Sequence, residues 1–62
     1  MHAQRLLLGI PEAAEMLGIS PWTVRKLIRR GALPCVHIGR RVLVEVREVD
    51  EFITRNRDAE KN

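Results

Sequence analysis

Six cationic side chains fall within residues 16–44, a stretch that contains no aspartate or glutamate. They are Arg25, Lys26, Arg29, Arg30, Arg40 and Arg41. The flanking residues 1–15 and 45–62 carry net charges of −1 and −2, so the formal charge of +3 understates how concentrated the positive block is. A block with a single sign of charge is typical of a surface that meets a polyanion, and nucleic acid is the polyanion that it favours.

The other reactive side chains show no catalytic or metal-binding pattern. Cys35 is the only cysteine, which excludes an intrachain disulfide and a CxxC zinc pair, and its apolar neighbours favour a buried or half-buried thiol. A triad of Ser20, His37 and a carboxylate would need an enclosed pocket, which 62 residues can scarcely form. We therefore expect a protein that is not an enzyme and that uses no metal and no cofactor.

The length of the chain and its apolar runs set the broad class. A chain of 62 residues has room for one domain, which buries only about 60% of its unfolded surface. The longest uninterrupted apolar runs, such as Leu6–Leu8, are far too short for a membrane span or the core of a signal peptide. We expect a small cytoplasmic protein with no membrane contact.

A first short helix is expected to begin at Ile10. Four apolar residues recur at i, i+3, i+4 and i+7 and would form its buried face: Ile10, Ala13, Ala14 and Leu17. Gly9 stands at the N-cap position, and Glu12 can reach back to the free amides of the first turn. Gly18 can adopt the left-handed conformation that ends a helix.

A second helix should follow after a tight turn. Ser20 is a strong N-cap, and Pro21 suits the first helical position. Gly31 followed by Pro34 stops the helix, so that the pair of helices ends at Arg30. Three apolar residues of this second helix fall on one side and must face the core: Val24, Leu27 and Ile28.

Beyond the helices the apolar period changes from 3.6 to 2. The β-branched runs Cys35–Ile38 and Arg41–Val44 predict a hairpin in which Gly39 supplies the positive φ of the turn. The turn could have two or four residues, and Arg40 lies at its tip in either case. Leu6–Leu8 could add a third strand against the hairpin.

A third helix completes the predicted domain. Its apolar residues are Val46, Val49, Phe52 and Ile53, with Glu45 as a potential cap. Glu51 could form i, i+4 ion pairs with Arg47 and with Arg55, each worth a few tenths of a kcal/mol. The predicted class is α+β, with one domain over residues 1–56 and a flexible tail over residues 57–62.

The outer side of the second helix carries the candidate binding residues. On a helical wheel Trp22, Lys26 and Arg29 lie opposite the apolar side. Lys26 and Arg29 are long and central enough to reach base edges, preferably guanine N7 and O6. Four other residues are better placed for phosphates: Ser20, Thr23, Arg25 and Arg30. Trp22 could pack on a sugar or a thymine methyl, or it could cover the first helix.

Each cationic group has a simpler alternative explanation. The charges of the second helix could form an ordinary solvated face, although such faces usually mix both signs to gain i, i+4 pairs. Arg40 and Arg41 could reach a narrow minor groove, or they could keep the hairpin edge from pairing with other chains. His37 could donate to a phosphate near the hairpin, or it could have no role.

Two segments together resemble a known family. The run IPEAAEMLGISPWTVRKLIRRGALP followed by VHIGRRVLVEVREVDEFI is similar to the small winged helix-turn-helix proteins of the excisionase type, relatives of the DNA-binding head of MerR-type regulators. The similarity extends from about Leu7 to Asn56. It implies a helix in the major groove of double-stranded DNA and a hairpin wing in the adjacent minor groove. It also implies that Trp22, Lys26 and Arg29 face bases, that Ser20, Thr23 and Arg25 hold backbone, and that His37 and Arg40 act in the wing.

The resemblance also implies a biological role. Gly9 replaces the usual Ser or Thr cap, Trp22 occupies a position that is often polar, and the chain ends without the dimerising coiled coil of MerR-type regulators. Excisionases are the better fit, which implies DNA bending, a phage integrase as partner and cooperative self-association on DNA. The alternative is a compact transcription regulator. A third hypothesis is a protein-interaction module, which would need a large apolar surface patch. The sequence suggests only Trp22 and Met16 as members of such a patch.

Overall fold

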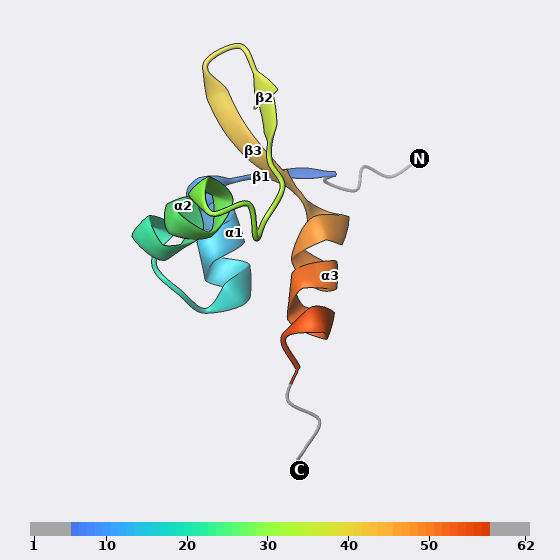
Figure 1. The fold of residues 1–62 in the computed structure, drawn as a ribbon. Coiled ribbons are helices and arrows are strands. Elements are labelled where there is room, and N and C mark those ends of the chain that lie inside the picture. Colours follow the sequence, from blue (N-terminus) through green and yellow to red (C-terminus); the bar gives the residue numbers. More distant parts are fainter. Residues whose placement is uncertain (1–5, 58–62) are drawn as a thin grey trace.

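The computed structural model describes residues 6–57, and within them it contains three helices and one three-stranded antiparallel sheet. Their order is β1 (Leu7–Gly9), α1 (Ile10–Leu17), α2 (Pro21–Arg29), β2 (Val36–Ile38), β3 (Arg41–Glu45) and α3 (Val46–Arg55). Helices α1 and α2 lie together at the base of the β2–β3 hairpin, which projects beyond them (Figure 1). The predicted α+β class is confirmed, including the N-terminal strand, which begins one residue later than predicted. The predicted tail lies almost entirely outside the described residues.

The sheet places β3 in the middle, in the order β1-β3-β2. Leu8 pairs with Val44, and His37 pairs with Val42, so these four side chains share the face of the sheet that meets the helices. Ile38 pairs directly with Arg41, which settles the hairpin turn at two residues. Gly39 has φ +61°, as the first central residue of a turn with a type II′ pattern requires. Residues 36–45, which form this hairpin, are called the wing below.

Helix α1 begins and ends largely as the sequence indicates. The Gly9 amide donates to Glu12 Oε1 at 2.7 Å, so the glutamate supplies half of a capping box although glycine has no side chain to supply the other half. At the other end Gly18 is left-handed, with φ +73°. The Gly18 amide donates to the Glu15 carbonyl and the Ile19 amide to the Ala14 carbonyl, which is a Schellman motif.

Helix α2 follows after only three residues. The Ser20 hydroxyl accepts a hydrogen bond from the Thr23 amide at 3.1 Å, which confirms the predicted N-cap. A second Schellman motif ends the helix: Gly31 has φ +79°, and the Ala32 amide donates to the Leu27 carbonyl at 2.9 Å. The short turn between the helices and the fixed end of α2 together determine the position of α2 relative to α1.

Eight buried apolar residues form the core of the described region. They are Leu8, Ile10, Ala13, Ala14, Val24, Leu33, Val44 and Val49. Leu33 was not predicted as a core residue because it lies in the loop between Gly31 and Pro34. Its amide donates to the Leu27 carbonyl at 3.3 Å, so the loop turns back under α2 and buries this side chain.

Several local predictions need correction. Cys35 precedes the strand rather than lying in it, because β2 begins at Val36. Glu45 occupies the N-cap position of α3 but makes no side-chain cap bond, and the Val46 amide donates instead to the Leu6 carbonyl at 3.0 Å. Ile53 lies at the edge of the apolar face of α3 and is 37% exposed. Within the described residues Glu51 pairs with Arg55, and the predicted pair with Arg47 is absent.

The Ser20→Ala variant should have a free energy of unfolding lower by about 1 kcal/mol, because the Thr23 amide loses its acceptor. For a domain of this size the melting temperature should fall by roughly 4–8 °C per kcal/mol, as measured by circular dichroism. Ser20→Asp is the matched control, since aspartate caps as well as serine does. An unchanged melting temperature in Ser20→Ala would contradict the capping role.

Candidate nucleic-acid interface

The orientation of α2 follows from its apolar edge. Val24 is completely buried, and Leu27 and Ile28 are half-buried against the core. The hydrophobic contacts therefore fix the rotation of the helix about its axis, as the predicted core face requires. The remaining side of α2 carries Arg25 and Arg29, both exposed, on successive turns of the helix.

The wing and α2 flank an open hollow of about 260 Å³. Arg25 and Arg29 line it from the helix, and His37 lines it from β2. His37 reaches this side because it pairs with Val42, which also lines the hollow. Cys35 lies in the wall as a half-buried free thiol. The structure thus brings together three predicted binding residues that are up to twelve positions apart in the sequence.

A second hollow, of about 270 Å³, shares Arg25 with the first. Arg40 and Arg41 line it from the tip of the wing, and Gly9 lines it where α1 begins. A Cβ atom on Gly9 would lie 3.6 Å from Arg41 Nη2, so the guanidinium of Arg41 lies over a residue without a side chain. Neither hollow has an aspartate or glutamate in its lining, and Arg25 stands between the cations of the helix and those of the wing.

Ser20 and Thr23 form a hydroxyl pair at the N-terminus of α2. Their oxygens lie 3.0 Å apart, so one of the two hydroxyl protons is used in the bond between them. Whichever of the two residues donates within the pair, the hydroxyl proton of the other can be donated to an acceptor outside the protein. The pair can therefore cap the helix and still donate one hydrogen bond outward.

Trp22 and Lys26 are stacked on each other. The Lys26 ammonium nitrogen lies 4.7 Å from the centroid of the Trp22 ring, which is a cation–π contact worth about 0.5–1 kcal/mol at an exposed site. Trp22 is 65% exposed and is not among the residues packed against the core. Arg30, the remaining predicted residue, is exposed at the C-terminal cap of α2.

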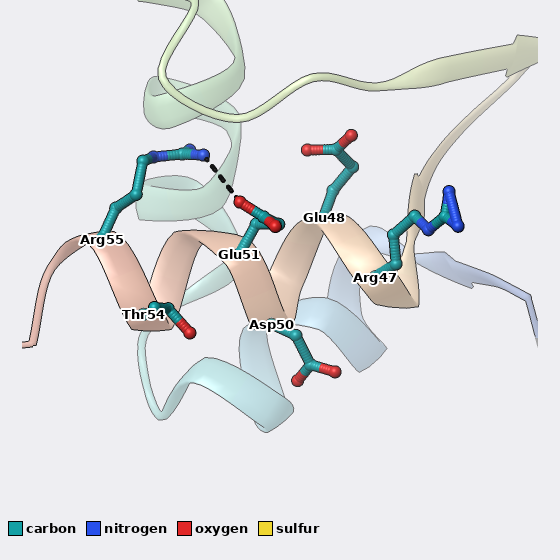
Figure 2. A pocket seen from close by; sticks show the side chains of 6 residues that line it. All are labelled: Arg47, Glu48, Asp50, Glu51, Thr54 and Arg55. Atoms are coloured by element: carbon teal, nitrogen blue, oxygen red, sulfur yellow. Dashed lines mark ion pairs between the residues drawn. The ribbon is translucent and has the colours of Figure 1, made fainter.

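Helix α3 presents a different surface. Figure 2 shows the polar side chains that line a hollow of about 650 Å³ along this helix: Arg47, Glu48, Asp50, Glu51, Thr54 and Arg55. Arg55 and Glu51 form an ion pair at 3.6 Å, with both side chains more than half exposed. Since three carboxylates accompany two arginines here, this surface does not match a polyanion, in contrast to the hollows beside α2.

The apolar residues beneath these cations were not predicted from the sequence to be part of the site. Ile10 and Val42 line both hollows, together with arginines of α2 and, in the second hollow, with those of the wing. The pairing of Val42 with His37 could be predicted only if the hairpin turn was known to have two residues.

In the described part of the chain no cluster of three His, Cys, Asp or Glu side chains could hold a metal ion. None of the helices described is long and apolar enough to cross a membrane.

Comparison with known proteins agrees with this geometry. A family described as "Helix-turn-helix domain" matches residues 7–57. Two relatives from Mycobacterium tuberculosis are 33% identical over 52 residues, which cover 84% of this chain and 67% of each relative. They are "Putative DNA-binding protein MT0521" of strain CDC 1551 / Oshkosh and "Putative DNA-binding protein Rv0500A" of strain ATCC 25618 / H37Rv. No solved structure matches the chain significantly.

Proposed function

The chain belongs to the helix-turn-helix domain family, and from this we propose that it binds double-stranded DNA with α2 in the major groove and the wing in the adjacent minor groove. One observation carries the proposal. Arg25 and Arg29 of α2 and Arg40 and Arg41 of the wing surround two adjoining hollows that have no carboxylate in their lining. Cations gathered around hollows that no carboxylate lines repel one another and favour a polyanion between them.

The position of Arg25 suits the path of the DNA backbone. The major and minor grooves are separated by one sugar-phosphate strand, so two elements in adjacent grooves must straddle that strand. Arg25 lines both hollows and would lie beside it. We assign Arg25 to phosphate, together with the outward proton of the Ser20–Thr23 hydroxyl pair and, at the far end of the helix, Arg30.

We assign the recognition of DNA bases to the central residues on the outer face of α2. Lys26 and Arg29 would meet base edges in the major groove, where guanine O6 and N7 are the preferred acceptors for both side-chain types. In the wing, Arg40 at the turn would enter the minor groove, and His37 would donate to backbone near it. The negative potential of a narrow minor groove attracts arginine in particular.

At a finer level, we propose an excisionase that bends DNA and directs a phage integrase toward excision. The support is the resemblance of residues 7–56 and the presence of two elements, α2 and the wing, that could reach DNA from one small domain. An element in each of two adjacent grooves can grip a deformed duplex on both sides of one strand. In this proposal several copies load cooperatively on DNA and contact the integrase.

Replacing Arg29 or Arg25 separates base reading from phosphate binding. We expect Arg29→Ala to weaken binding to a specific site by roughly 1–3 kcal/mol, with a smaller effect on random DNA. Arg25→Ala should weaken both, and it should reduce the slope of log affinity against log salt, roughly −4 to −5 for four to six phosphates, by about 1. Fluorescence anisotropy with a specific and a random duplex at several salt concentrations measures both effects.

Arg47→Ala is the matched control, because Arg47 is an exposed arginine of α3 that lies in the mixed-charge surface. It should leave both affinities nearly unchanged. Equal losses on specific and random DNA for Arg29→Ala would contradict base reading by this residue.

DNA bending tests the finer proposal. In circular-permutation gels the protein should bend DNA that carries its site, and Arg40→Ala should reduce both affinity and bend because the wing loses its minor-groove contact. A bound but straight duplex would contradict the excisionase. A transcription regulator would then be favoured, and repression of a reporter without any effect in an excision assay would identify it.

A further inference from the structure

Trp22 is the one large apolar side chain that stands exposed on the outer face of α2. It is 65% exposed and lies outside the core and its partly buried surroundings. Among the described residues, the other exposed large apolar side chains lie on different elements or beside them: Leu6, Met16, Ile38 and Ile53. A single exposed apolar side chain is ordinary, but this one lies among cations on the surface that we assign to DNA.

The contact with Lys26 limits how the indole can meet a ligand. The ammonium lies over the ring at 4.7 Å from its centroid, so that face is already occupied. The rest of the exposed surface of the indole is left for contact. An apolar ring next to an ammonium group presents a hydrophobic contact and a hydrogen-bond donor side by side.

The chemistry of the major groove provides a match for this pair. Base pairs present hydrogen-bond donors and acceptors there, and their single apolar group is the C5-methyl of thymine. Guanine presents the acceptors O6 and N7, which suit a lysine. Residues four apart on a helix are separated by about 6 Å along its axis, which is comparable to two base-pair steps of about 3.4 Å.

We propose that Trp22 and Lys26 form one reading unit that recognises a thymine methyl next to a guanine, within two base-pair steps. Trp22 contacts the methyl group, and Lys26 donates to the guanine. The unit rests on the proposed function, since it requires α2 in the major groove. Trp22 then contributes to the choice of sequence by hydrophobic contact, although it makes no hydrogen bond to a base.

Thymine-to-uracil substitution tests this unit directly, because deoxyuridine lacks only the methyl group. A binding duplex is first selected from random DNA, and each thymine is then replaced singly. We expect the wild-type affinity to fall about fourfold at one thymine close to a guanine, as burial of one methyl group implies. In Trp22→Ala the same uracil should cause no further loss, while Trp22→Phe should keep most of the penalty.

Met16→Ala is the matched control, because Met16 is an exposed apolar residue on α1, 47% exposed, and should retain the full uracil penalty. Circular dichroism establishes that each variant is folded. Uniform affinity at every uracil position, or an unchanged penalty in Trp22→Ala, would overturn the reading unit and leave DNA binding intact. Failure of the selection to enrich any sequence would instead overturn the proposed function, and with it this inference.

Discussion

The packing of α2 through Val24 is the interaction on which the rest of the structure depends. Val24 is completely buried, and the helix has only three residues of turn before it and a Schellman motif after it. The helix therefore cannot rotate or slide without exposing Val24 or breaking a cap. Because of this constraint, Arg25 and Arg29 face the wing, while Trp22 and Lys26 occupy the next part of the outer surface.

Repulsion between the cations of α2 and the wing is a destabilising interaction that the small core must offset. Cations that surround two hollows without carboxylates repel one another in the free protein, and this repulsion opposes folding. The eight buried residues and the caps of α1 and α2 must offset it. Three acidic residues lie instead on α3, where Glu51 pairs with Arg55, and Glu12 of α1 accepts a hydrogen bond from the Gly9 amide. The arrangement keeps the cations available for a polyanion at some cost in stability.

Most of the fold could be predicted from the sequence, because its signals are local. Gly18, Ser20 and Gly31 mark helix ends by their own backbone or side-chain chemistry, and the structure has those ends where they predict. Long-range packing could not be predicted as well from the sequence. Leu33 is buried because its loop turns back under α2, and Arg25 lines both hollows because α2 lies beside the wing. A periodic sequence pattern contains neither the path of the loop nor the placement of the wing. The stacking of Lys26 on Trp22 likewise depends on side-chain conformation rather than spacing alone.

In the proposed complex, α2 and the wing engage adjacent grooves of one duplex, with Arg25 at the backbone between them. Methylation interference tests this arrangement most directly, since it reports guanine N7 in the major groove and adenine N3 in the minor groove in one experiment. We expect methylation to block binding at guanines in one major-groove segment and at adenines in the neighbouring minor groove. In Arg40→Ala only the adenine effect should be lost. Binding that is insensitive to methylation in the major groove would contradict the proposed complex.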